Sequence, residues 1–274
     1  MERSPRLARR PRRRALFALI RRDFLIQRSY RIAFVFDLFF TILNLLVAYF
    51  VSRTFAGVET ASLGGAPSYF DFAAVGLTLS AVVAATSTAL AARVREEQLT
   101  GTLEALVAQP ITPTELAFGF AGFPISFATL RTAGYLLIAG TLLGLDLSRA
   151  NWPGFVLVLL LTATAFVGIG ILAGALVLVV KRADALTGAI LFTMSLVSGA
   201  AFPVSVLPGW LETVGRLSPM RSAFDGVRAA LFGRDWHGDA LFLAIFSAVG
   251  IPLAVFLFGK ALAYGRRAGS LGQY

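Results

Sequence analysis

Long runs of apolar residues constrain this chain more than any other feature of its sequence. Several stretches of about twenty residues hold one ionisable group or none. Twenty helical residues at 1.5 Å each cover the ~30 Å hydrocarbon core of a bilayer, so such a run predicts a membrane-spanning helix. Only 15% of the 274 residues are charged, against ~25% in a typical soluble domain. The chain is therefore expected to be an all-α integral membrane protein.

Six such runs predict six transmembrane helices in one domain over residues 32–262. They are Ile32–Ser52, Phe72–Ala92, Phe118–Leu145, Pro153–Val180, Leu186–Ala201 and Ala240–Leu262. The fifth run is short, which leaves open whether that helix stands nearly upright or breaks near its end. Residues 1–31 precede the domain as a basic tail, and residues 263–274 follow it as a second tail.

The basic residues predict the orientation, because arginine and lysine accumulate on the cytoplasmic side. With the N-terminus inside, 18 of the 25 fall on the inner side and six on the outer side, and Arg131 lies within a span. Both termini are therefore expected to be cytoplasmic. Only Lys181 and Lys260 are lysines, a bias typical of a GC-rich bacterial genome, so the expected location is the bacterial plasma (inner) membrane.

The basic N-terminal segment predicts a helix in the membrane interface. Arg14, Arg21 and Arg28 recur every seven residues, and the opposite side carries Leu16, Phe17, Ile20 and Phe24. A basic amphipathic helix of this kind lies in the interface plane and binds anionic lipid. We therefore assign the net charge of +10 to a lipid surface and expect no nucleic-acid partner. The alternative is a basic region that merges directly into the first span.

The loop between the second and third spans, residues 93–115, predicts a short separate helix. Its apolar residues at helical spacing are Leu99, Leu103, Leu106 and Val107. After Pro110, the sequence Thr112, Pro113 and Glu115 predicts the next helix start, with a hydroxyl cap and a carboxylate that reaches back. An apolar helix face in water is expected to bind a groove on another protein. The alternative is packing beneath its own bundle.

Residues 203–239 predict two short helices on the outer side, between the fifth and sixth spans. Pro208-Gly209-Trp210 opens the first, and Ser218-Pro219 starts the second with a hydroxyl cap and a proline in the first turn. In the second helix, Arg221 and Arg228 are each spaced to pair with Asp225 across one turn. The two helices either dip back into the membrane or lie on it, where Trp210 fits an interfacial aromatic belt.

Three polar residues inside the expected spans are candidates for a specific role. A charge at the centre of a spanning helix costs ~2.5–3.5 kcal/mol on insertion scales. We therefore expect Arg131 in the third span and Asp37 in the first to have a structural or functional role that compensates this cost. They form a structural pair, or they line a polar conduit. Asn44 shares a face with Asp37, and that face lines a conduit or joins two helices.

No motif in the sequence predicts a catalytic site. The phosphate-binding pattern GxxxxGK[ST] is absent, as are the GxSxG and HExxH patterns. Cysteine is absent and His237 is the single histidine, so a thiolate or histidine metal centre is not expected. No cofactor is expected in this chain, and uphill transport would need a partner or an ion gradient.

Two segments resemble ATP-binding-cassette type 2 (ABC-2) exporter permeases. One is the loop segment REEQLTGTLEALVAQP at residues 95–110, and the other is SGAAFPVSVLPGWLETVGRLSPMRSAFDGVRAAL at residues 198–231. The basic N-terminal segment and the six spans agree with this family. The resemblance implies a dimer, with a second copy or a homologous permease, on two cytoplasmic ATPase subunits that bind ATP and Mg.

The resemblance also implies roles for particular residues. The loop helix, Gly101–Gln109, would couple to the ATPase, with Leu103, Glu104 and Leu106 at its centre and Leu99, Gly101 and Val107 beside them. The outer helices would line the exit, and they carry Trp210, Arg221, Asp225 and Arg228. The path would run between protomers along the first and fifth spans, with Asp37, Asn44 and Arg131 as candidate path residues.

The leading hypothesis is thus the permease subunit of an ATP-driven exporter. The first span, RSYRIAFVFDLFFTILNLL, lacks the Leu-Gly…Trp…Pro pattern of the polysaccharide-exporting branch, which favours an amphipathic drug, lipid or glycolipid as substrate. An ion-coupled secondary transporter is the alternative and predicts an internal repeat and interrupted helices. A membrane-bound enzyme of lipid metabolism and a purely structural subunit are further alternatives.

Overall fold

The computed structural model describes residues 21, 31–54, 63, 65–109, 111–180 and 183–268, and these residues form helices without a strand. The helices are α2 (Arg31–Thr54), α3 (Tyr69–Leu99), α4 (Thr102–Val107), α5 (Pro113–Leu142), α6 (Trp152–Val179), α7 (Ala183–Val197), the 3₁₀ turn η1 (Val204–Val206), α8 (Gly209–Arg216), α9 (Pro219–Leu231) and α10 (His237–Ala268). The expected interface helix lies outside the described residues, apart from Arg21.

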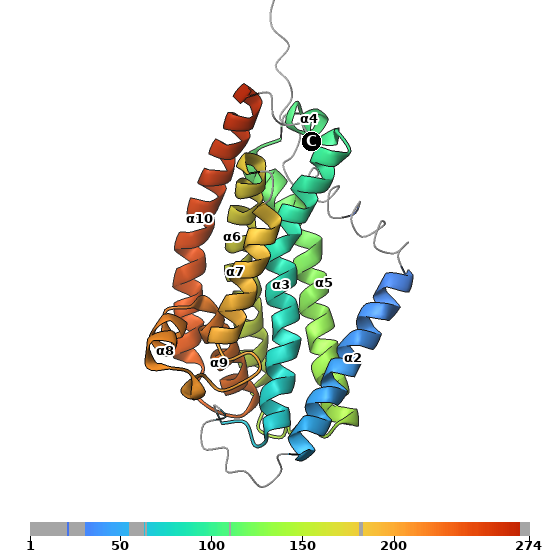
Figure 1. Cartoon of the computed structure of the whole chain (residues 1–274), viewed down its shortest axis with the longest axis vertical. Helices are drawn as coiled ribbons and strands as arrows, with labels where there is room; N and C mark the ends of the chain where they lie inside the picture. The colour runs from blue at the N-terminus through green and yellow to red at the C-terminus, as the bar shows by residue number, and fades with distance from the viewer. Residues whose placement is uncertain are drawn as a thin grey trace, which may run out of the picture.

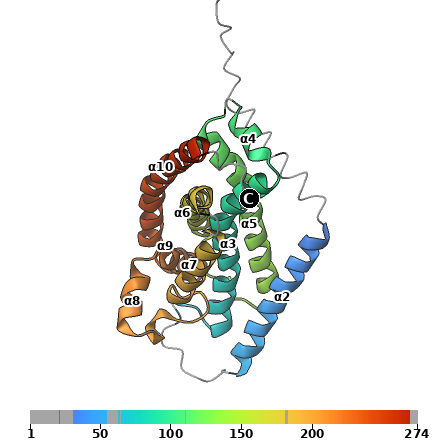
Figure 2. The ribbon, with the colours of Figure 1, turned by 45° about the horizontal axis from the view of Figure 1, so that its top comes forward.

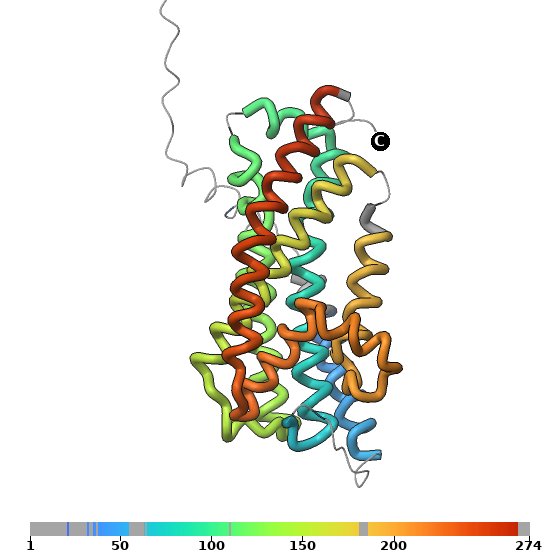
Figure 3. Tube along the Cα trace, turned by 90° about the vertical axis from the view of Figure 1, so that its left-hand side faces the viewer, coloured from blue at the N-terminus to red at the C-terminus, as the bar shows by residue number. Residues whose placement is uncertain are grey.

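The long helices form an elongated bundle with a short helix or helix pair at each end (Figure 1). The short helix α4 lies at one end, which we call the α4 end. The pair α8 and α9 lies toward the opposite end, which we call the α9 end. Helices α3, α6 and α10 run from the α9 end to the α4 end, and α5 and α7 run back (Figure 3).

Helix α6 lies at the centre of the bundle, between α3 and α10 (Figure 2). Its small residues let α3 approach closely. A Cβ atom on Gly170 would lie 2.5 Å from the carbonyl oxygen of Thr86, so only glycine fits there. Other small residues of α6, such as Ala163 and Thr162, are fully buried. Such small-residue packing is typical of helices that associate within a membrane.

Four of the described helices are long and apolar enough to cross a membrane: Tyr69–Leu99, Pro113–Leu142, Trp152–Val179 and His237–Arg267. They correspond to the second, third, fourth and sixth predicted spans. The first and fifth predicted spans correspond to shorter apolar helices, Leu38–Thr54 and Leu186–Val197. The all-helical membrane architecture is therefore confirmed, with four candidate spans plus two shorter apolar helices.

Helix α3 is longer than the sequence predicted at the α4 end. The expected loop began at Arg93, but the helix continues to Leu99, and an ion pair of 2.5 Å between Arg93 and Glu96 lies on its last turns. The prediction ended the helix where the apolar run ended. A helix can continue into water because its backbone hydrogen bonds are internal to it. Leu99 consequently belongs to α3 and not to the short helix.

Two clusters of buried apolar side chains form the core. The cluster toward the α9 end joins α3, α6, α9 and α10 and includes Phe166 and Phe224. The cluster toward the α4 end includes Leu103, Phe120 and Phe258. Helix α2 lies at one side of the bundle (Figure 1) and α7 at another (Figure 3), and α2 exposes large side chains such as Phe36 and Phe50. Exposed apolar faces of this kind suit contact with lipid.

Candidate functional site

A tight turn separates α4 from α3 and makes it an independent short helix, as the sequence predicted. The last turn of α3 closes with a hydrogen bond of 3.0 Å from the Thr100 amide to the Glu96 carbonyl oxygen. Gly101 then adopts a φ of +70°, a left-handed conformation that glycine takes without a steric penalty. The chain thereby leaves the direction of α3 within two residues and begins α4 at Thr102.

Contacts from three elements hold α4 against its own bundle. Leu103 is 0% exposed and packs in the cluster that contains Phe120 and Phe258. The Thr102 hydroxyl donates a hydrogen bond to the Glu97 carboxylate on α3. At the other end of α4, the Arg266 guanidinium on α10 donates to the Val107 carbonyl oxygen at 2.7 Å. Helix α4 is therefore attached to α3, α5 and α10 together.

The exposed side of α4 carries polar or small residues rather than large apolar ones. Leu106 and Val107 are partly buried against the same core cluster, whereas Gly101, Glu104 and Gln109 are exposed. The interpretation that the apolar side packs beneath its own bundle is thus confirmed for Leu103. Leu99, expected on that side, is 63% exposed at the end of α3. A partner at this end would meet Leu99 and the polar side of α4.

The predicted capping box at the start of α5 is present. The Thr112 amide donates to the Glu115 carboxylate at 2.8 Å, and the Glu115 amide donates to the Thr112 hydroxyl oxygen at 3.2 Å. Pro113 occupies the first turn. These reciprocal bonds stabilise the helix start and fix where the chain passes from α4 into α5.

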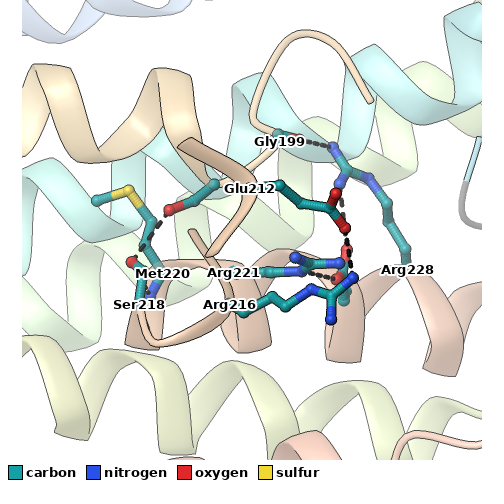
Figure 4. Close-up of polar contacts among 9 residues, drawn as sticks. Gly199, Glu212, Arg216, Ser218, Met220, Arg221 and Arg228 are labelled. Carbon is teal, nitrogen blue, oxygen red and sulfur yellow. Dashed lines mark hydrogen bonds and ion pairs between the residues drawn. The ribbon is translucent and has the colours of Figure 1, made fainter. Parts of the chain in front are cut away.

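At the α9 end, α9 presents the ion pairs that the spacing predicted. Arg221 Nε lies 3.2 Å from Asp225 Oδ2, and Arg228 Nη1 lies 3.8 Å from Asp225 Oδ1. On α8, Arg216 pairs with Glu212 at 2.7 Å and thereby lowers the pKa of Glu212. Figure 4 shows these charged side chains gathered between α8 and α9. A cavity of about 370 Å³ lies beside them, lined also by Asp239 and Arg234.

Arg228 has a larger role than its spacing to Asp225 indicates. Its side chain is 1% exposed, and its guanidinium lies 3.6 Å from the centroid of the Phe72 ring. Both Nε and Nη2 donate to the Phe72 carbonyl oxygen on α3, at 3.3 and 3.2 Å. Nη2 also donates to the carbonyl oxygens of Gly199 at 2.7 Å and Ala200 at 3.3 Å, just after α7 (Figure 4). Arg228 therefore joins α9 to α3 and to the end of α7.

Burial and close backbone packing characterise this junction. Burial lowers the pKa of Arg228 to about 10, and the nearby Asp225 carboxylate opposes that effect, so the guanidinium is charged at neutral pH. A Cβ atom on Gly76 of α3 would collide with the Ala200 carbonyl oxygen. The junction thus depends on glycine at position 76 as well as on Arg228. The sequence signal that we missed is that Phe224 and Leu231 share the buried helical face of Arg228.

The remaining predicted site residues are not gathered in one place. Arg131 lies midway along α5, with its guanidinium 5.9 Å from the Phe127 ring centroid and 5.8 Å from that of Tyr135. The exposed Asn44 amide donates to the Phe40 carbonyl oxygen of its own helix at 2.8 Å. The Asp37 side chain lies outside the described residues. A conduit or an Asp37–Arg131 pair stays a prediction.

Trp210 is exposed on α8, as an interfacial aromatic residue would be. It is 70% exposed and lies in a row of exposed apolar side chains at helical spacing: Trp210, Val214 and Leu217. Among the residues that the structure describes, no cluster of three or more His, Cys, Asp or Glu side chains could hold a metal ion.

The fold and the two ends define a class: a multi-pass α-helical membrane protein with a fixed short helix at one end and a paired-helix cap at the other. The profile of the ABC-2 type transporter family matches residues 14–232. The chain therefore belongs to the ABC-2 type transporter family and is a membrane transport permease. This family implies partnership with an ABC ATPase subunit.

Two curated relatives carry the same printed name. Nodulation protein J of Sinorhizobium fredii (strain NBRC 101917 / NGR234) is 28% identical over 213 residues, which cover 75% of this chain and 79% of that protein. Nodulation protein J of Rhizobium meliloti (strain 1021) is 26% identical over 170 residues, 61% of this chain and 63% of that protein.

Proposed function

We propose that this chain is the membrane subunit of an ATP-driven exporter that moves an amphipathic substrate, a drug, lipid or glycolipid, out of the cytoplasm or the inner leaflet by alternating access. Membership of the ABC-2 family supports the transport function. The observation that carries the ATP-driven part is the geometry of α4. A short helix that is anchored by Leu103 and exposes Glu104 is suited to receive a mechanical displacement from a partner.

Helix α4 would pass such a displacement to three long helices. Its start joins α3 through the Gly101 turn, and its end leads within six residues to the capped start of α5. The bond between Arg266 and the Val107 carbonyl oxygen adds α10. Because interdigitated helices move as units rather than deform continuously, a shift of α4 would reposition these helices together. ATP and Mg would bind to the partner subunits.

The proposed assembly is a dimer of permeases, with itself or with a homologous chain, on two ATPase subunits. We propose six spans with both termini in the cytoplasm of a bacterium. Helix α2, at 24 residues, is ~36 Å long by helical rise and would cross the membrane alone. Helix α7, at 15 residues, is ~22 Å long and would need the cap of α8 and α9 to complete the outer leaflet. These two helices would line the path between protomers, and α8 and α9 would line the exit.

The continuous central helix argues against an ion-coupled secondary transporter. That class builds its sites from interrupted helices near the midplane. Helix α6 is unbroken from Trp152 to Val179, and its Gly170 serves the contact with α3. The glycines of this helix are therefore accounted for by packing.

The coupling function is tested with the permease co-purified with its ATPase and reconstituted into vesicles. Reversing the charge of Glu104 with E104K should lower ATP hydrolysis by the co-purified complex, because it alters the exposed side of α4 and leaves the Leu103 anchor intact. The control, D235K, changes an exposed acid at the α9 end and should leave hydrolysis unchanged. Equal hydrolysis in E104K and the parent protein would remove α4 from the proposed coupling.

A further inference from the structure

A groove of about 540 Å³ opens between the start of α5 and the last turns of α10, at the α4 end. Its floor is apolar and includes Phe256 and Ala263 of α10 and Pro113 of α5, and its rim carries Lys260 and Arg267. The two helices come close where Gly259 faces Pro113, with a Cβ on Gly259 3.6 Å from the proline ring. The groove is therefore a shallow, open depression between two helices.

The groove lies at the expected depth of lipid headgroups. Lys260 follows the start of α10, His237, by 23 residues, which is ~35 Å along the helix axis. The hydrocarbon core is ~30 Å thick. With the start of α10 at one interface, the Lys260 ammonium thus reaches the opposite interface. Phe256, one turn earlier, still lies at the level of the acyl chains.

The charge of the groove has one sign. Lys260 and Arg267 are both exposed and are seven residues apart, so they lie on the same side of α10. The Lys260 ammonium lies 5.1 Å from the centroid of the Phe256 ring. No carboxylate is among the described residues that line the groove, in contrast to the cavity at the α9 end, where Glu212, Asp225 and Asp239 face the arginines.

We propose that this groove binds an anionic phospholipid of the inner leaflet, with the phosphate between Lys260 and Arg267 and the first part of an acyl chain on Phe256. Basic pockets between helices on the cytoplasmic side bind such headgroups. The proposal rests on the proposed topology, which places the α4 end in the cytoplasm. A free phosphate would contact the two basic side chains but not the apolar surface of the groove. An uncharged lipid would contact the apolar surface but would not pair with the two cations.

The site is connected to α4 through adjacent arginines. Arg267 lines the groove, and its neighbour Arg266 donates to the Val107 carbonyl oxygen of α4. Pro113 forms part of the groove and also begins α5, just after the segment that follows α4. A bound lipid would therefore hold together the parts of α5 and α10 that support α4.

The test measures lipid adducts of the full-length chain by native mass spectrometry. The purified protein in neutral detergent is titrated with phosphatidylglycerol and, separately, with phosphatidylcholine. We expect retention of phosphatidylglycerol over phosphatidylcholine. Each of K260Q and R267Q should weaken phosphatidylglycerol retention about fivefold, the factor that corresponds to ~1 kcal/mol per basic residue at a lipid surface. The double variant should lose the preference.

Matched variants decide the outcome. R266Q removes the same charge one residue away, on a side chain that contacts α4, and should retain phosphatidylglycerol, as should R149Q at the α9 end. Unchanged phosphatidylcholine adducts and unchanged thermal unfolding show that K260Q/R267Q is folded. Equal retention of the two lipids, equal loss in R149Q, or displacement of phosphatidylglycerol by an equal concentration of inorganic phosphate would each overturn the proposal. Because the assay needs no ATPase or substrate, its failure is distinct from failure of the proposed export function.

Discussion

The substitution R228M tests whether one buried guanidinium holds the α9 end together. It removes the bonds to α3, through the Phe72 carbonyl oxygen, and to the segment after α7, through Gly199 and Ala200. A hydrogen bond from a charged group contributes ~1.5–3 kcal/mol, so the two attachments amount to ~3–6 kcal/mol. Methionine also relieves the desolvation that lowers the pKa of Arg228 to about 10. We therefore expect R228M to destabilise the protein by ~3 kcal/mol.

The comparison variant is D225N, which separates the ion pair from the carbonyl contacts. The Asp225 side chain is 40% exposed and lies 3.8 Å from Arg228 Nη1. Because the Asp225 carboxylate is partly solvated and its separation from the Arg228 guanidinium is long, this pair contributes ~0–1 kcal/mol, so D225N should have a small effect.

Both variants are compared by denaturant titration in detergent micelles, followed by tryptophan fluorescence. Trp210 on α8 and Trp236 before α10 lie at the α9 end and report its opening. If D225N destabilises the protein as much as R228M does, the ion pair and not the carbonyl contacts would anchor α9. If R228M changes the unfolding free energy by less than ~1 kcal/mol, the attachment of α9 to α3 and α7 by Arg228 would be refuted.

Two further substitutions test close packing at the two ends. G76A should destabilise the protein by ~1–3 kcal/mol in thermal unfolding, because the new Cβ meets the Ala200 carbonyl oxygen. The control, G134A on α5, places a Cβ where nothing lies within 4 Å, and it should be neutral or stabilising. Stabilisation by G76A would contradict the close packing of α3 against Ala200. L103A should lower the free energy of unfolding by ~2–5 kcal/mol and speed amide hydrogen exchange in α4. The control, L99A, changes a 63% exposed position and should leave the exchange unchanged. Equal effects of the two substitutions would contradict the anchoring of α4 by Leu103.

Local signals in the sequence predicted the elements well. The apolar runs located each long helix among the described residues, with ends that differ by up to seven residues, as at Leu99 of α3. The capping box of Thr112 and Glu115, and the proline starts of the two short helices, were predicted correctly. These features depend on residues within one or two turns of each other, so the sequence contains the information directly.

Contacts between distant segments could not be predicted in the same way. The periodic apolar residues of α4 predict an apolar side, but whether that side meets a partner or its own bundle depends on where α5 and α10 lie. The structure packs Leu103 inward and leaves Glu104 exposed. The continuation of α3 to Leu99 was missed because helix length need not match the length of the apolar run.

The sequence by itself determined that the chain folds as helices long enough for a membrane, because burying an unpaired backbone in hydrocarbon is prohibitive and the apolar runs have the length of a bilayer. Only the tertiary structure decided what Arg228 does. Asp225 is the partner that lies close to it in the sequence. The Phe72 and Gly199 carbonyl oxygens are 156 and 29 residues from Arg228 in the sequence. They reach the guanidinium because α9 folds back against α3 and the end of α7, and no local pattern encodes that arrangement.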